Sequence, residues 1–394
     1  MRYPTMIVLS SCFLATSVAA ADQPPLDCGK KSLAAALADA REKDPTITFT
    51  GICSGPIVIK TDGVTLHGVG EAIIDGAGQD AVTIAGASRV SLAGIEIRNG
   101  QNGIVAVNGA HVSLTSLNVH HNLASGISVQ TGSSAVFTAV TTGQNGLNGI
   151  DIHSGSVATV NGTLSTTGNR VFGINVNGSS ITFAEATVSA TGNALGIQIA
   201  TSANAFIADS DTVINANNNL ATGLTVVSGS HLVSFGGTIN ASNNPGVGVS
   251  VNSKSGLDLD AGSTLNSFEN GDGLLIQQNS VMTVFNTPQF SGVPGFSTID
   301  AHSNMRTGVR VLTDAVLTLV NQARVLSSQN GTTGFVADNG AGVVLVNSTI
   351  TGNTARDIQL TFGARADFQT LTFGTYTCDA TVLVRGTSGI VCPS

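Results

Sequence analysis

The chain has 394 residues, of which only 10% are charged and 4% aromatic, whereas 47 are glycine. So few aromatic residues require a core of Val, Ile, Leu and Ala, and so many glycines predict numerous turns. The formal net charge of -8 excludes a nucleic-acid-binding protein, because no basic stripe is present to neutralise phosphates.

The first 20 residues have the organisation of a secretory signal peptide. Arg2 supplies a positive start, residues 6–18 are apolar, and small residues around Ala20 offer a cleavage site. No other stretch approaches the roughly 18 apolar residues of a membrane span. We therefore predict a secreted or periplasmic protein with a signal peptide at 1–20 and no membrane span after cleavage.

The segment 21–54 is expected to form an N-terminal cap. Within it, Lys30 to Asp44 has the pattern of an amphipathic helix, placed to cover the first turn of the following structure. Residues 376–394 are expected to close the other end as a C-terminal cap.

Four cysteines remain after cleavage of the signal peptide, two near each end of the chain. An even number in an exported chain indicates disulfides. Local pairing is the simplest of the three possible connectivities. A metal site is the alternative, but no histidine lies near either pair, so we expect neither a metal nor a cofactor. The cysteines are Cys28, Cys53, Cys378 and Cys392.

A short motif recurs through residues 55–375. It consists of Asn, three residues, Gly and then alternating apolar residues. Most spacings between its glycines are 23 to 27 residues, which is too short for paired-helix repeats, and the leucine pattern of leucine-rich repeats is missing. Each unit holds two or three short strand patterns, so we predict an all-β, single-stranded parallel β-helix of about 12 rungs. The glycines are Gly103, Gly126, Gly149, Gly173, Gly196, Gly223, Gly248, Gly273, Gly308 and Gly334.

The asparagines of the motif should stack from rung to rung. Their amides would bond to one another and to turn backbone, forming an internal ladder. We expect each repeat glycine to permit a positive φ or a tight turn at a corner. The ladder residues would be Asn99, Asn122, Asn145, Asn169, Asn193, Asn219, Asn244, Asn270, Asn304, Asn330 and Asn353.

The opening CGKKSLAAALADA, the stretch GVTLHG and the repeated N-x-x-x-G-I-x-V units resemble the right-handed parallel β-helix repeat family of the pectate-lyase-like superfamily. The resemblance implies a right-handed coil over nearly the whole mature chain. It also implies polysaccharide as the commonest ligand class, since lyases, hydrolases, epimerases and phage or surface proteins share this coil. It does not assign an activity.

Strand alternation brings one polar constellation to the outside of the coil. The first and third residues after each repeat glycine face the core, and the second and fourth face water. Asp151 and His153 then share an outward face, about 7 Å apart along the strand. They are candidate catalytic residues, with His153 as base and Asp151 orienting it, and a solvated polar patch is the alternative. The surrounding candidate substrate-binding residues are Ser128, Gln130, Asn175 and Asn177.

This Asp-x-His pattern is similar to the start of the Asp-Pro-His-Glu motif of mannuronan epimerases. Only Asp151 and His153 match, because Ile152 and Ser154 replace the proline and the glutamate. A lyase or epimerase also needs a cation to neutralise the substrate carboxylate, and the adjacent outward columns contain no Lys or Arg.

A hydrolase would need two carboxylates about 5 to 9.5 Å apart. The sequence GLDLDAG places Asp258 and Asp260 on one outward face at about 7 Å. No His, Arg or Tyr is visible beside them, so we interpret them as surface charge.

The adjacent His120 and His121 form a second histidine feature. Neighbours in a strand point to opposite sides, so both would ligate one metal ion only if they lay in a turn. We expect His121 to stack with Arg98 and Gln144.

A second candidate site lies in the longest repeat, residues 286–311. Its Pro and Gly content predicts a loop that projects from the coil and walls a binding groove. The polar residues of this segment are Asp300, His302, Arg306 and Arg310, and the two arginines are candidate substrate-binding residues.

The sequence thus predicts an exported β-helix protein that binds or modifies polysaccharide through an outward strand face. The alternative is a non-catalytic scaffold or adhesion rod. Whether the chain is an enzyme stays open; as an enzyme it would resemble a polysaccharide lyase or epimerase rather than a two-carboxylate hydrolase.

Overall fold

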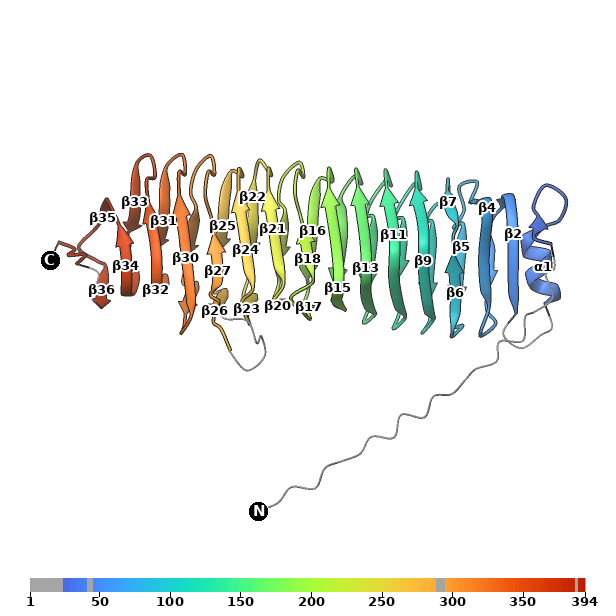
Figure 1. Cartoon of the computed structure of the whole chain (residues 1–394), viewed down its shortest axis with the longest axis horizontal. Coiled ribbons are helices and arrows are strands. Elements are labelled where there is room, and N and C mark those ends of the chain that lie inside the picture. Colours follow the sequence, from blue (N-terminus) through green and yellow to red (C-terminus); the bar gives the residue numbers. More distant parts are fainter. Residues whose placement is uncertain (1–23, 41–44, 288–294, 387–388, 394) are drawn as a thin grey trace, which may run out of the picture.

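The computed structural model describes residues 24–40, 45–287, 295–386 and 389–393 (Figure 1). The predicted signal peptide, 1–20, lies outside the described residues. The chain winds into one long solenoid in which each turn pairs with the next through parallel strands. The predicted all-β parallel coil is therefore confirmed. In the described parts of the chain, no helix has the length and apolar character needed to cross a membrane.

A 14-stranded sheet forms one side of the coil and contains the strand that follows each repeat glycine. Its members are β3 (Ile57–Ile59), β5 (Val82–Ala85), β8 (Ile104–Val107), β10 (Ile127–Val129), β12 (Ile150–His153), β14 (Phe172–Asn177), β16 (Leu195–Ala200), β19 (Leu224–Val226), β22 (Val247–Val251), β25 (Asp272–Ile276), β28 (Val309–Leu312), β31 (Thr333–Asp338), β33 (Arg356–Leu360) and β35 (Tyr376–Cys378).

A bent 22-stranded sheet forms the remaining sides. Its members are β1 (Leu26–Asp27), β2 (Thr46–Ser54), β4 (Thr65–Asp75), β6 (Val90–Ala93), β7 (Glu96–Arg98), β9 (His111–His120), β11 (Ser134–Gly143), β13 (Val157–Thr167), β15 (Ser180–Thr191), β17 (Asn204–Ile207), β18 (Val213–Asn215), β20 (His231–Phe235), β21 (Thr238–Ser242), β23 (Gly256–Asp260), β24 (Thr264–Phe268), β26 (Val281–Val284), β27 (Ser297–Asp300), β29 (Val316–Leu319), β30 (Ala323–Ser328), β32 (Gly342–Thr351), β34 (Arg365–Phe373) and β36 (Leu383–Gly386).

The coil has more turns than the sequence motif indicates. Fourteen strands lie in the smaller sheet, against about twelve predicted rungs. The two extra strands, β3 and β35, lie at the ends, where the Asn and Gly of the motif are missing. Parallel pairing also extends on both sides of residues 55–375, because β2 pairs with β4 and β36 pairs with β34.

The core is a stack of aliphatic side chains with one layer for each rung. Ile150 and Ile152 are buried, and they pair with Ile127 and Val129 of the preceding rung. Each such side chain contributes about 1.5–3 kcal/mol by leaving water. Because every second residue is committed to this core, the residues between them must face outward.

The predicted asparagine ladder is confirmed from Asn122 onward. Both the backbone N–H and the Nδ2 group of Asn145 donate to Oδ1 of Asn169, at 3.1 and 2.9 Å. The same pair of hydrogen bonds links each asparagine to the next as far as Asn353, whose backbone N–H and Nδ2 group both donate to Oδ1 of Asp357. These buried amides are therefore satisfied by one another.

Asn99 is an exception, and its expected ladder role is wrong. It lies one residue before the ladder position, with φ of 56°, and its Nδ2 donates to Oδ2 of Asp75 at 2.8 Å. Gly100 occupies the ladder position instead and donates its N–H to Oδ1 of Asn122. Asn99 lies four residues before the repeat glycine, as the ladder asparagines of other rungs do, so the sequence pattern aligned it with the ladder one residue too early.

The repeat glycines do not adopt positive φ, so that part of the expectation is also wrong. These positions are glycine because the asparagine ladder passes beside them and leaves no room for a Cβ. A Cβ on Gly126 would lie 2.7 Å from Nδ2 of Asn145 and 2.7 Å from the carbonyl oxygen of Gly149. Positive φ occurs instead at the corner one residue before the ladder, as in His121 (54°) and Gln144 (52°).

Both ends of the coil carry the predicted disulfides. Cys28 is bonded to Cys53 and Cys378 to Cys392, with Cα–Cα distances of 5.0 and 5.4 Å. Helix α1 (Leu33–Asp39) lies at the N-terminal end of the coil (Figure 1). It begins after Ser32, whose Oγ accepts the N–H of Ala35. The helix is thus shorter than predicted, and residues 41–44 lie outside the described residues.

Candidate functional site

The outward residues of the 14-stranded sheet form the columns predicted from the sequence. Ser128, Asp151 and Asn175 occupy equivalent positions on β10, β12 and β14, and His153 pairs with Asn177. We call the outward face made by these strands the central face. Its six residues are Ser128, Gln130, Asp151, His153, Asn175 and Asn177.

The two candidate catalytic residues of the central face have separate hydrogen-bond partners. Asp151 Oδ1 accepts a hydrogen bond from Asn175 Nδ2 at 2.8 Å. His153 has Ser154 Oγ 2.9 Å from Nδ1 and Ser128 Oγ at 3.5 Å from Nε2. No hydrogen bond or ion pair joins Asp151 to His153 in the described structure. The pair therefore lacks the contact by which a carboxylate orients an imidazole base.

The two candidate arginines lie far from the central face and are already paired. Arg310 on β28 belongs to the same outward column but is six rungs beyond Asp151, about 29 Å at 4.8 Å per rung. Arg306 Nη2 and Arg310 Nη1 lie 2.9 and 3.1 Å from Oδ2 of Asp272, whose side chain is only 4% exposed. The structure thus does not bring these cations to Asp151 and His153.

The segment 286–311 is not a single projecting loop. Strands β27 and β28 lie within it, and residues 288–294 are outside the described residues. Asp300 ends β27 in the larger sheet, whereas His302 stacks on Phe268 with ring centroids 5.1 Å apart. The four polar residues of this segment therefore do not form one site.

The expected surface pair of Asp258 and Asp260 is also different in the structure. Asp260 is buried and accepts hydrogen bonds from Ala261 N and from Thr287. Asp258 does have a histidine beside it, because His231 Nε2 lies 3.0 Å from Oδ2. The hydrogen bond to Asp258 raises the pKa of His231, against the lowering effect of burial.

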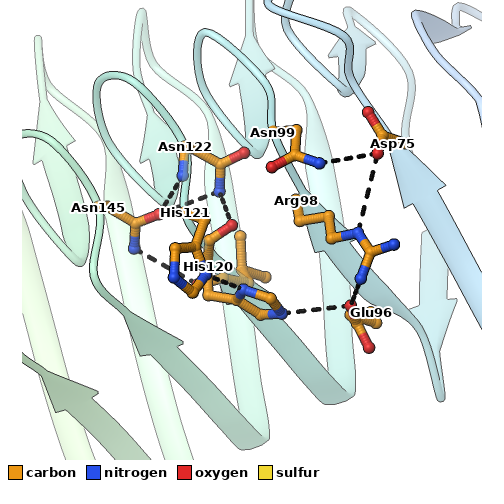
Figure 2. Close-up of polar contacts among 9 residues, drawn as sticks. Asp75, Glu96, Arg98, Asn99, His120, His121, Asn122 and Asn145 are labelled. Atoms are coloured by element: carbon orange, nitrogen blue, oxygen red, sulfur yellow. Dashed lines mark hydrogen bonds and ion pairs between the residues drawn. The ribbon is translucent and has the colours of Figure 1, made fainter.

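A charged cluster that the sequence reasoning missed lies on the larger sheet, at β4, β7 and β9 (Figure 2). Asp75, Arg98 and His120 occupy equivalent positions on these strands. Glu96 Oε1 lies 2.9 Å from Arg98 Nη1 and 3.3 Å from His120 Nε2, and Arg98 Nε lies 3.8 Å from Asp75 Oδ2. With His121, these residues form what we call the charged cluster.

A one-residue error in alignment explains why the sequence did not predict this cluster. The alignment of Asn99 with the ladder shifted the rung by one residue, so His121 was expected beside Arg98. In the structure His120 pairs with Arg98. The usable signal is the charge of Glu96 and Arg98 on one short strand, in a chain with very few charged residues.

Burial is the main influence on the pKa of His120, a member of the charged cluster. It lowers the pKa of His120, and the nearby His121 and Arg98 lower it further, whereas Glu96 acts in the opposite direction. The net lowering keeps the His120 imidazole neutral at neutral pH.

An open groove of about 320 Å³ lies next to the charged cluster. It follows the bend of the larger sheet, where Gly70, Gly94 and Ser116 adopt positive φ. Glu71 and Glu96 are among its lining residues. This groove is therefore acidic, and it lies on a different side of the coil from the central face.

The parallel strands, the asparagine ladder and the single stacked core define a parallel β-helix. The sequence profile of the right handed beta helix region matches residues 47–188 and, in an overlapping match, residues 102–270. Together the two matches cover more than half of the chain. The chain therefore belongs to this family.

Several solved structures are similar to the chain at low identity. Tailspike protein 2 of bacteriophage CBA120 matches at 10% identity and a TM-score of 0.41, with 61% of this chain and 43% of that chain covered. The periplasmic alginate epimerase AlgG matches at 11% and 0.40, with 98% and 100% covered. The A-module of the Azotobacter vinelandii mannuronan C-5 epimerase AlgE6 matches at 14% and 0.33, with 89% and 93% covered.

The chain thus spans less than half of the length of the matched tailspike domain. Among curated proteins, none matches the chain in sequence. These similarities assign no activity to the chain, so the function must be argued from its own residues.

Proposed function

We propose that the chain is an exported protein that binds polysaccharide along the central face and the outward residues of the next three rungs, β16, β19 and β22. The observation that carries the proposal is an outward column of hydrogen-bonding side chains with one member for each rung. Only one of its six members is charged. The column consists of Ser128, Asp151, Asn175, Gln198, Thr225 and Ser250.

The chemistry of this column suits a neutral or weakly charged sugar polymer. Amides and hydroxyls both donate and accept hydrogen bonds, as sugar hydroxyls do. A repeating polymer laid along the coil would meet similar groups at each rung, so individually weak contacts would add up. Gln198 and Asn177 make no side-chain hydrogen bond in the described structure, and their amides are therefore available to a ligand.

Binding is favoured over catalysis by the separation of the charged groups. Asp151 and His153 share no hydrogen bond or ion pair in the described structure, and the two candidate substrate-binding arginines, Arg306 and Arg310, lie six rungs away and already neutralise Asp272. A lyase or epimerase would need a cation for the substrate carboxylate beside the base. The signal-peptide pattern and the two disulfides support export, because disulfides persist in oxidising compartments.

The test is a binding screen of the mature chain against acidic and neutral polysaccharides, by affinity electrophoresis and on a glycan array. We expect Asn175→Leu to weaken binding by about tenfold or more, the equivalent of one lost hydrogen bond with its partner left unpaired. The matched control is Thr187→Leu, an exposed position of the larger sheet, which should bind like the wild type. Equal binding by both variants, or no bound polymer at all, would refute the proposal and favour the scaffold rod.

The same preparation decides between binding and turnover. Unsaturated-product absorbance and reducing ends should be followed for the wild type, Asp151→Asn and His153→Ala. We expect no product from any of the three. Product that is lost in both variants would make the pair catalytic and would overturn the non-catalytic part of the proposal.

A further inference from the structure

The two adjacent histidines of the charged cluster face each other. Strand β9 ends at His120, and His121 adopts φ of 54°, so the chain turns between them. In a continuous strand the two rings would point to opposite sides. Here the turn brings the two Nδ1 atoms to 2.6 Å from each other (Figure 2).

The far side of the His120 ring is held by a carboxylate. Glu96 Oε1 lies 3.3 Å from Nε2, and Arg98 fixes Glu96 in turn through a contact of 2.9 Å. A carboxylate on Nε2 keeps the ring proton there and leaves a lone pair on Nδ1. Histidines that bind metal ions commonly have this outer carboxylate, which sets the tautomer and the orientation of the ring.

The backbone of the histidine pair is fixed by the coil. The first amide of the asparagine ladder, Asn122 Nδ2, donates to the His120 carbonyl at 3.2 Å, and the His121 N–H donates to the Gly143 carbonyl at 3.2 Å. The residue opposite His120 on the next rung is Gly143, which has no side chain to cover the pair from that direction. The two nitrogens are thus presented from a rigid support with an open side.

We propose that His120 and His121 form a binding site for a divalent transition-metal ion, with Cu²⁺ as the preferred ion. Two nitrogens that each lie about 2.0 Å from a metal are about 2.8 Å apart at a right angle and about 3.3 Å apart at a tetrahedral angle. From the hydrogen-bonded separation of 2.6 Å, the rings need to open less to reach the right-angled, tetragonal arrangement of Cu²⁺ than the tetrahedral arrangement of Zn²⁺. The exposed His121 side chain has room to make the remaining adjustment.

The site uses two protein ligands, with water completing the coordination. No group of three or more His, Cys, Asp or Glu side chains suitable for a metal ion occurs among the described residues. Cu²⁺ binds nitrogen ligands more tightly than the other divalent ions of its series, so it is the ion for which two imidazoles suffice best. Binding displaces the proton between the two Nδ1 atoms, and the neutral His121 ring then carries its proton on Nε2.

The test is a titration of the tag-free mature chain with Cu²⁺, followed by calorimetry and by electron paramagnetic resonance. We expect one ion for each chain, with spectral splitting from two nitrogens. His121→Asn should weaken binding by about 30-fold or more and leave one nitrogen. Asparagine suits this position, because Asn99 occupies the equivalent corner of the preceding rung with φ of 56°. Glu96→Gln should weaken binding by about tenfold through the loss of the outer carboxylate.

The matched control is His231→Asn, which removes a histidine that lies elsewhere on the coil and should leave Cu²⁺ binding unchanged. Circular dichroism confirms that each variant retains its β-structure. Equal Cu²⁺ affinity in the wild type and His121→Asn would overturn the proposal, because the ion would then occupy another site. A signal with one nitrogen in the wild type, or tighter binding of Zn²⁺ than of Cu²⁺, would also overturn it.

Discussion

The asparagine ladder and the central face both place polar side chains at the rung spacing of the coil, but to opposite effect. Inside the corner, each amide is buried and donates to the next, as Asn145 does to Asn169. On the central face, Asn175 bonds only to Asp151, and the Asn177 amide is exposed. An asparagine amide therefore stabilises the coil where it is enclosed and paired, and it is free to recognise a ligand where it is open to water.

The largest effect should come from breaking the ladder. Asn244→Leu removes the acceptor for both the backbone N–H and Nδ2 of Asn219. Each buried donor left unpaired costs about 1–3 kcal/mol, so we expect a loss of about 3–5 kcal/mol in the free energy of unfolding, measured by chemical denaturation. The control Asn177→Leu, at an exposed position of the central face, should lose less than about 0.5 kcal/mol. If Asn244→Leu were as stable as Asn177→Leu, the buried ladder amides would contribute no more to stability than the exposed ones.

A smaller loss is expected where the ladder crowds a repeat glycine. In Gly149→Ala, the new Cβ would meet Thr142 Oγ1 at 2.5 Å and the Gly173 carbonyl oxygen at 2.6 Å. Overpacking of this kind costs about 1–3 kcal/mol, and it should lower the midpoint of thermal unfolding. The comparison is Gly342→Ala, where the nearest contact of the added Cβ is 3.6 Å, and no lowering is expected there.

A weaker effect on the free energy of unfolding should come from the change of the His231 charge with pH. Its hydrogen bond to Asp258 raises the pKa of the imidazole above that of the unfolded chain. The stabilisation is therefore fully present below the unfolded pKa of about 6.5 and is lost as pH rises through the folded value. Since the His231 side chain is 43% exposed, screening limits the effect to less than about 1 kcal/mol.

The measurement is the unfolding midpoint between pH 5 and pH 8, for the wild type and for Asp258→Asn. In Asp258→Asn, the part of the pH dependence of the unfolding midpoint that comes from His231 should be lost. An unchanged slope in the variant would show that His231 and Asp258 are not coupled in solution. The ¹H NMR titration of the His231 ring gives an independent reading of the raised pKa.

The smallest effect on stability should come from the central face itself. Asn175→Leu changes an outward side chain, and its one hydrogen bond to Asp151 is partly exposed. We expect a change within about 0.5 kcal/mol in the free energy of unfolding, together with the tenfold loss of polysaccharide binding predicted above. A large loss of stability would mean that the central face, like the ladder, is structural.

Much of the fold follows from the spacing of a few residues. The interval between repeat glycines sets the length of a rung, and the alternation after them decides which side chains enter the core, so the register of Ser128, Asp151 and Asn175 was predictable. The disulfide pairing followed from the position of the cysteines near the ends. End rungs such as β3 and β35 were not counted, because they lack the motif.

The contacts within the sites were not predictable in the same way. Alternation placed Asp151 and His153 on one face but says nothing of the direction in which each side chain turns, and the structure gives them separate partners. The charged cluster depends on a one-residue shift at Asn99, which the repeat spacing hides.

The sequence by itself determined the coil, its register and the residues of the core, because burial of alternate apolar side chains leaves only one pairing of the rungs without exposed core residues. The tertiary structure alone decided which polar groups meet. Such contacts depend on the corner conformation of single residues, as at His121, and on distances between rungs that periodicity does not encode. The coil and the register of most of its rungs can therefore be predicted from the sequence, whereas the contacts within its sites are found only in three dimensions.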